Sequence, residues 1–316
     1  MPQSRFDRRA IPSRASESRW QAADGWSIRR IDWAIPAGQA KGSILFLPGR
    51  GDFYEKYLET LAHWNDLGWN VTASDWRGQA DSGRLGKDPV TGHIDDFSTW
   101  CEDLGLFWKR WKAEMPGPHV LAGHSMGGHL VLRTVAEGLA DPDALILSAP
   151  MLGFTASLLP QGVMHQAAKL MKSLGDPRRP AWKWSEAPGQ VPDKRAHLLT
   201  HDAERYADEL WWRDNRPQLV MGPGSWGWVE RAYASMRLLE RPDLLESVRV
   251  PVVIVATDDD KLVGWKPIAR AAARLPDCEL VHFGAEARHE VLRESDGVRG
   301  RALAACDAML ARIAAS

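Results

Sequence analysis

Cysteine is scarce in this chain of 316 residues. The three that occur are Cys101, Cys278 and Cys306, which stand far apart in the sequence. An odd number of widely spaced cysteines argues against a disulfide framework, the usual support of small secreted proteins. It is typical of proteins that work in a reducing compartment, so we expect a cytoplasmic location.

Long apolar runs and an excess of one charge are also missing. No stretch of about 18 apolar residues occurs, so we expect no membrane-spanning segment. The 40 basic and 41 acidic residues give a net charge of −1. Because no basic stripe with interleaved aromatic residues is present, we expect no nucleic-acid partner. The polar, arginine-rich residues 1–20 lack an apolar core of signal-peptide length and are expected to form a loosely ordered leader.

Sequence patterns for metals and nucleotides are absent as well. A zinc-binding helix motif opens at His289-Glu290, but Arg293 stands where its second histidine would be. The loop at residues 47–51 contains glycine but lacks the Gly-Lys-Ser/Thr of a phosphate-binding loop. We therefore expect neither a metal ion nor a cofactor.

What the chain does contain is an alternation of short apolar strands and helices. Buried strands are predicted at 43–47, 70–74, 119–122, 144–148, 252–255 and 279–283. Helical periodicity separates them, and the alternating residues 26–35 predict an antiparallel edge strand. Apolar strands alternating with helices are typical of a parallel sheet covered on both faces. The sequence therefore predicts an α/β fold with a mostly parallel central sheet.

A tryptophan-rich interval interrupts this alternation. The chain has 16 tryptophans against 7 phenylalanines and 4 tyrosines. Residues 154–240 combine tryptophan, proline and charge with helical segments at 164–174 and 203–212. We interpret this interval as a helical cap inserted into a core formed by residues 21–153 and 241–316. Tryptophan suits an apolar slot or a lipid interface, and packing within the cap is an equally good explanation.

A candidate nucleophile follows the strand at 119–122. Gly123-His124-Ser125-Met126-Gly127 has the Gly-x-Ser-x-Gly pattern between a strand and a helix, which is the context of a nucleophile elbow. Glycine at both ends lets the strand and the helix pass close to the serine. The turn presents the hydroxyl to a base and to a substrate, and the N–H groups of the new helix face the same site.

Loops after the late strands supply an acid and a base. His289 follows the strand at 279–283, and Asp258, Asp259 and Asp260 follow the strand at 252–255. The chain order serine, acid, histidine is that of α/β-hydrolase triads. Asp260 is the preferred acid because the apolar residues after it can pack under the loop. Asp258 is the alternative.

The loop after the first apolar strand completes the predicted site. Its glycines flank Arg50, whose backbone N–H can bind a developing oxyanion beside that of Met126. The side chains predicted to contact substrate are Trp226 and Trp228 in the cap.

Six motifs in order resemble the monoacylglycerol lipase and lysophospholipase L2 group of serine hydrolases, which is related to the serine aminopeptidases of family S33. They lie at 48–51, 75–82, 123–128, 147–150, 260–263 and 289–294. The resemblance covers about residues 25 to 315 and implies the α/β-hydrolase fold. It also implies that Ser125 is the nucleophile, Asp260 the acid and His289 the base. The chain departs from the group at Pro48-Gly49, where a His-Gly pair is usual and the histidine normally braces the oxyanion loop.

The expected activity is hydrolysis of carboxylic esters through an acyl-enzyme, with a lysophospholipid or a monoacylglycerol as substrate and a transient membrane-surface contact through the cap. A short-chain carboxylesterase is one alternative. An aminopeptidase is another, for which an acidic patch of Glu186, Glu204, Asp208 and Glu209 would capture a peptide N-terminus. A non-catalytic binding module is the third.

Overall fold

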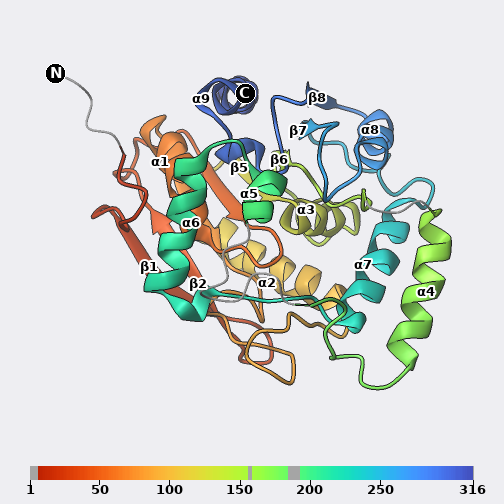
Figure 1. Cartoon of the computed structure of the whole chain (residues 1–316). Coiled ribbons are helices and arrows are strands. Elements are labelled where there is room, and N and C mark those ends of the chain that lie inside the picture. Colours follow the sequence, from red (N-terminus) through yellow and green to blue (C-terminus); the bar gives the residue numbers. More distant parts are fainter. Residues whose placement is uncertain (1–5, 156–158, 184–192, 316) are drawn as a thin grey trace.

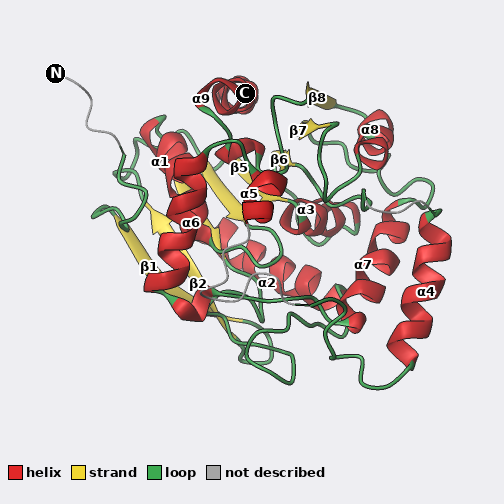
Figure 2. Cartoon of the chain, in the orientation of Figure 1, coloured by secondary structure: helices red, strands yellow, loops and turns green. Residues whose placement is uncertain are grey.

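The computed structural model of the protein describes residues 6–155, 159–183 and 193–315. Within these ranges the strands form one sheet with the order β1-β2-β4-β3-β5-β6-β7-β8 (Figures 1 and 2). The strands are β1 (Ala15–Gln21), β2 (Ser27–Trp33), β3 (Ser43–Leu47), β4 (Asn70–Ser74), β5 (His119–His124), β6 (Ala144–Ser148), β7 (Val252–Thr257) and β8 (Cys278–Phe283). β2 pairs antiparallel with β1 and β4, and the remaining pairs are parallel. The predicted mostly parallel sheet is confirmed.

Apolar side chains on both sides of the central strands explain why helices cover both faces. Successive residues of a strand point to opposite faces, so Ile44 and Phe46 of β3 join one core cluster while Leu45 and Leu47 join the other. The first cluster includes residues of α1 (Leu58–Asp66) and α9 (Asp296–Ala314). The second includes residues of α2 (Ser98–Glu114), α3 (Met126–Ala136) and α8 (Trp265–Arg274).

Further helices lie between β6 and β7. They are α4 (Gln161–Ser173), α5 (Asp193–Leu199), α6 (Ala203–Asn215), η2 (Pro217–Leu219) and α7 (Trp226–Leu239). α4 packs against α7, whereas α6 packs against η1 (Tyr54–Tyr57), and Figure 1 shows these two groups apart from each other. None of the helices within the described residues combines the length and the hydrophobicity of a membrane span.

The N-terminal residues differ from the prediction. β1 pairs with β2 along its whole length, from Ala15 opposite Trp33 to Gln21 opposite Ser27. Upstream, the guanidinium groups of Arg8 and Arg9 contact the Asp208 carboxylate on α6 at 2.5 and 2.6 Å. The expectation of a loosely ordered leader over 1–20 is therefore wrong for residues 6–20. The error has a physical cause: an exposed edge strand is polar and resembles a loop in sequence.

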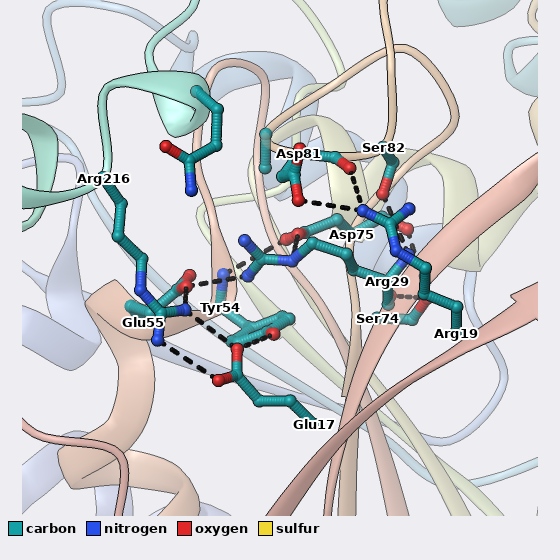
Figure 3. Close-up of polar contacts among 12 residues, drawn as sticks. Glu17, Arg19, Arg29, Tyr54, Glu55, Ser74, Asp75, Asp81, Ser82 and Arg216 are labelled. Carbon is teal, nitrogen blue, oxygen red and sulfur yellow. Dashed lines mark hydrogen bonds and ion pairs between the residues drawn. The ribbon is translucent and has the colours of Figure 1, made fainter.

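A polar cluster joins β1 to the rest of the fold (Figure 3). The Arg29 guanidinium from β2 lies between Glu55, with 2.7 Å from Nη2 to Oε1, and Asp75, with 3.2 Å from Nε to Oδ2. Arg216, at the end of α6, contacts Glu55 at 3.0 Å and Glu17 of β1 at 2.9 Å. The cluster connects β1, β2, η1 and the end of α6, so sequence-distant segments depend on one another.

Candidate active site

The serine after β5 occupies a strained turn. Ser125 has φ 53° and ψ −118°, between the end of β5 at His124 and the start of α3 at Met126. A positive φ is unfavourable for a residue that carries a side chain, so the surroundings must hold it. Backbone bonds do this: the Ser125 N–H donates to the Ser148 carbonyl, and its own carbonyl accepts from Met151 N–H, both at 2.9 Å. The turn has the geometry predicted for a nucleophile elbow.

Two glycines make this turn possible. A Cβ added at Gly127 would overlap the carbonyl oxygens of Leu47 and Pro48 on the neighbouring strand end. A Cβ added at Gly123 would lie 2.7 Å from the Gly127 carbonyl carbon. Real Cβ atoms do not approach backbone so closely, so the expected role of both glycines is confirmed.

The three residues predicted from the strand ends lie in hydrogen-bond contact. His289 Nε2 lies 2.9 Å from Ser125 Oγ, and His289 Nδ1 lies 2.6 Å from Asp260 Oδ2. An ionised carboxylate only accepts hydrogen bonds, so Nδ1 carries the proton and Nε2 accepts from the serine hydroxyl. This is the arrangement in which a histidine removes the serine proton.

The structure also distinguishes between the aspartates after β7. Asp260 is 3% exposed, and its second carboxylate oxygen accepts the backbone N–H groups of Leu262 and Val263 at 2.7 and 3.0 Å. The alternative, Asp258, is half exposed and pairs with His282 at 3.0 Å. Asp260 is therefore the carboxylate that is placed to orient His289.

The charges around His289 favour its protonated form. Burial lowers the pKa of His289, but the Asp260 carboxylate, with help from Glu290 and Asp52, outweighs burial and raises this pKa above its ordinary value. The neighbouring His124, whose ring centroid lies 4.8 Å from that of His289, behaves oppositely. Burial and the nearby His289 hold the pKa of His124 well below its usual range, so its ring is neutral.

The loop after β3 lies against the serine, as an oxyanion loop requires. A Cβ added at Gly49 would lie 3.1 Å from Ser125 Cβ, and the next residue, Arg50, lines the cavity beside the serine. Gly51 N–H donates to Gln79 Oε1 at 2.7 Å, which fixes the loop from the segment after β4. Met126 begins α3, so its N–H has no acceptor in an earlier turn of that helix.

A cavity of about 640 Å³ opens beside Ser125 and His289. Its wall is mainly apolar and includes Met151, Phe154, Met164, Met171, Trp228 and Tyr233. Both tryptophans predicted to contact substrate, Trp226 and Trp228, line it. α4 supplies several of these side chains, although its sequence showed only helical periodicity. The space and polarity suit an acyl chain.

Positively charged side chains also reach the cavity wall, which the sequence did not indicate. Arg50, Arg195 and Lys261 line it. The Arg50 guanidinium lies 5.0 Å from the ring centroids of both Trp182 and Trp228 and donates to the Gly222 carbonyl at 2.7 Å. Stacking on aromatic faces holds this cation beside a mainly apolar space.

The acidic patch considered for peptide binding is not assembled at the cavity. Asp208 contacts Arg8 and Arg9, and Glu204 is exposed. Glu209 is buried at 2.9 Å from Lys56 Nζ. None of these three belongs to the described lining of the cavity, and Glu186 lies outside the described residues.

Comparison with known proteins places this site in a family. Lysophospholipase L2 of Escherichia coli strain K12 is 28% identical over 278 residues, which cover 82% of this chain and 77% of that protein. Monoacylglycerol lipase of Mycolicibacterium smegmatis is 27% identical over 165 residues, 52% of this chain and 56% of that protein. A soluble variant of monoglyceride lipase from Saccharomyces cerevisiae superposes with a TM-score of 0.73 at 18% identity, covering 98% of both chains.

The fold and the resemblance inferred from the motifs are both confirmed. A carboxyl esterase from Bacillus coagulans also superposes, with a TM-score of 0.71 at 18% identity over 96% of this chain and 100% of that one. These likenesses confirm the α/β-hydrolase fold. A family model described as serine aminopeptidase, S33, matches residues 38–296, which is most of the chain. The chain therefore belongs to the serine aminopeptidase S33 family.

Proposed function

We propose that the protein is a carboxylic ester hydrolase that acts through Ser125, His289 and Asp260. The observation that carries the proposal is the pair of hydrogen bonds from His289, 2.9 Å to Ser125 Oγ and 2.6 Å to Asp260 Oδ2. A serine hydroxyl is a weak nucleophile until a base takes its proton, and a buried carboxylate holds that base in the right tautomer.

The reaction follows from this geometry. Ser125 Oγ attacks the acyl carbon while His289 Nε2 takes the hydroxyl proton. The backbone N–H groups of Arg50 and Met126 bind the oxyanion of the tetrahedral intermediate. When that intermediate collapses, His289 returns the proton to the leaving alcohol, and the acyl group stays on Ser125. A water molecule, deprotonated by the same histidine, then releases the acid.

The substrate we propose is a lipid with one acyl chain. The mainly apolar cavity fits the chain, with Trp226 and Trp228 in its wall, and the similarity to a lysophospholipase L2 and a monoacylglycerol lipase supports a lipid ester. Charges of both signs line the cavity, since Arg195 pairs with Glu209 at 3.6 Å, Lys261 pairs with Asp259, and Asp52 and Glu290 belong to the same wall. The proposed substrate class therefore includes both lysophospholipids and monoacylglycerols.

Contact with a lipid surface through α4 is part of the proposal. α4 directs Met164 and Met171 into the cavity wall. Next to these methionines, α4 exposes Val163 and Leu170, with exposed fractions of 49% and 60%, and Leu174 follows at 57%. Apolar side chains in water beside the wall of a substrate cavity are typical of a membrane-binding surface. A cytoplasmic location is also proposed, supported by three free cysteines.

The test compares the wild type with Ser125→Ala on p-nitrophenyl esters of increasing chain length, on monoacylglycerol and on lysophosphatidylcholine. We expect turnover by the wild type and a loss of at least about a thousandfold in the variant. Rates that rise with chain length support a lipid substrate. If acetyl and butyryl esters are hydrolysed faster than long ones, the protein is a short-chain carboxylesterase. Turnover of aminoacyl amides alone would contradict the proposal and favour an aminopeptidase.

A further inference from the structure

One buried lysine contacts carboxylates from three separate parts of the fold. Lys56, in η1, has a side chain with 0% exposure. Its Nζ lies 2.6 Å from Asp52 Oδ1, 2.6 Å from Glu290 Oε1 and 2.9 Å from Glu209 Oε2. An ammonium group has three N–H donors, so each carboxylate can receive one. Burying such a charge is costly unless its partners are this complete.

The three carboxylates are attached to functionally distinct segments. Asp52 is in the oxyanion loop, two residues after Arg50, and Glu290 is the residue after His289. Glu209 is on α6, between β6 and β7. Lys56 therefore links the two loops that carry the oxyanion donor and the base, and connects both to a helix outside the core of the sheet.

Neighbouring groups fix the carboxylates further. Tyr57 donates its hydroxyl to Asp52 Oδ2 at 2.9 Å. Arg293 contacts Glu290 and also Glu209, the latter at 3.4 Å. Burial by itself lowers the pKa of Lys56, but Asp52, Glu209 and Glu290 outweigh burial and raise this pKa, so the side chain stays an ammonium. The pKa of Asp52 is lowered to about 2, chiefly because Lys56 overcomes the effect of its burial.

This arrangement also accounts for an apparent metal site. Asp52, His124 and Glu290 place possible ligand atoms within 4.8 Å of one another. The cation between the two carboxylates is the Lys56 ammonium, 2.6 Å from each. A metal ion would have to displace it, so these residues do not form a metal site while Lys56 is present.

We propose that Lys56 is a positioning residue, which holds the oxyanion loop and the His289 loop in the geometry that the reaction needs and anchors both to α6. The inference rests on the proposed ester hydrolysis. The oxyanion loop begins at Pro48-Gly49. The Lys56–Asp52 pair supplies a brace from the other end of that loop.

The experiment compares Lys56→Met with Arg205→Met. Arg205 of α6 is the control because it is also a buried cation, 5% exposed, with three carboxylate partners, none of them in the oxyanion loop or next to His289. Its guanidinium reaches the segment between His289 and α9 through the Glu294 carbonyl, at 2.9 Å. We expect Lys56→Met to lower kcat on a p-nitrophenyl ester about a hundredfold while KM changes less than about threefold. Arg205→Met should lower the melting temperature while kcat stays within about threefold of the wild type.

A second readout does not depend on the natural substrate. A trifluoromethyl ketone forms a hemiketal with the serine, so its affinity reports on Ser125, the oxyanion loop and His289 together. We expect Lys56→Met to weaken this binding about as much as it lowers kcat. Ketone affinity and kcat that change no more than in Arg205→Met would overturn the inference. Failure of the wild type to hydrolyse esters would overturn the proposed function instead, and the ketone would still decide the role of Lys56.

A third variant keeps the inference testable if Lys56→Met does not fold. Asp52→Asn removes one carboxylate charge, which weakens the link between the ammonium and the oxyanion loop, and leaves Glu209 and Glu290 in place. We expect a melting temperature close to that of the wild type and a kcat lowered about tenfold, with ketone affinity lowered in parallel. Unchanged ketone affinity in this folded variant would contradict the inference.

Discussion

At the scale of single residues, the protonation of His289 controls the proposed reaction. Three carboxylates, on Asp260, Glu290 and Asp52, raise its pKa above the ordinary 6.5. A general base must be neutral to accept the serine proton. Raising the pKa therefore means that activity is lost at a higher pH when the solution is acidified. The same charges stabilise the imidazolium once it forms.

This environment predicts the pH dependence of the rate. We expect kcat/KM for an ester to fall as the pH drops through a midpoint above 6.5 in the wild type. Glu290→Gln removes one negative neighbour, so the midpoint should move to lower pH. The measurement is a pH–rate profile of both proteins. A midpoint that moves upward in the variant, or does not move, would contradict the assignment of Glu290.

The packing around Gly127 predicts a second residue-scale effect. Gly127→Ala forces a methyl group against the Leu47 and Pro48 carbonyls, so we expect it to lower the free energy of unfolding by about 1–3 kcal/mol. Gly300→Ala is the control, since a Cβ there meets nothing within 4 Å in the middle of α9 and should stabilise by about 0.5–1 kcal/mol. Chemical denaturation measures both. Equal effects of the two substitutions would exclude the steric explanation.

At the scale of elements, α4 exposes large apolar side chains next to those that line the cavity, which is unusual for a helix on a protein surface. Met164 and Met171 face the cavity, and Val163 and Leu170 face solvent. The proposed contact with a lipid surface would account for the exposure of Val163 and Leu170 and would bring substrate beside the cavity.

A lipid-binding role of α4 predicts that substitutions on its exposed apolar side chains weaken vesicle binding selectively. The double variant Val163→Glu/Leu170→Glu should bind phospholipid vesicles at least about tenfold more weakly, since two exposed apolar side chains are replaced by charges. Hydrolysis of dissolved p-nitrophenyl butyrate should stay within about twofold. Ala304→Glu/Ala308→Glu, at exposed positions of α9, is the control. Vesicle co-sedimentation makes the comparison, and equal binding by all three proteins would rule out α4 as the lipid contact.

At the scale of the whole molecule, contacts of the residues before β1 connect α6 to the sheet. Arg8 and Arg9 share the Asp208 carboxylate, and the Arg8 carbonyl accepts from Trp212 Nε1 at 2.9 Å. The cluster in Figure 3 adds the link from Arg216 to β1. Because α6 also carries Glu209, the partner of Lys56, these N-terminal contacts help to place the helix that Lys56 connects to the loops of the site.

Loss of the Asp208 carboxylate, which pairs with Arg8 and Arg9, should destabilise the protein. Asp208→Asn leaves two arginines without their shared charge, so we expect the free energy of unfolding to fall by about 1–3 kcal/mol. For a domain of this size that corresponds to a melting temperature lower by about 2–4 °C for each kcal/mol. Glu204→Gln, on the same helix but 63% exposed, should change stability by less than about 0.5 kcal/mol. Calorimetry measures the melting temperatures of both variants. Similar values would contradict a stabilising role of the Asp208 contacts with Arg8 and Arg9.

Local sequence predicted the features of the protein whose physical cause lies in neighbouring residues. Apolar runs between helices predicted the parallel sheet, because strands buried on both faces need apolar side chains throughout. Gly123 and Gly127 predicted the elbow, and loops after late strands predicted Asp260 and His289, because parallel strands end at one edge of the sheet. These three side chains were brought together from positions 125, 260 and 289 by topology that the strand pattern already implied.

Only the tertiary structure decided which polar residues meet across the fold. Lys56, Asp52 and Glu209 belong to three different segments, and a charged residue that is buried in a network looks the same in sequence as one on a solvated surface. The expectation for residues 6–20 was wrong for the same reason, since the contacts of these residues with β2 and Asp208 join positions far apart in the chain. Hydrophobic periodicity is a local signal, whereas ion pairing depends on distances that exist only after folding.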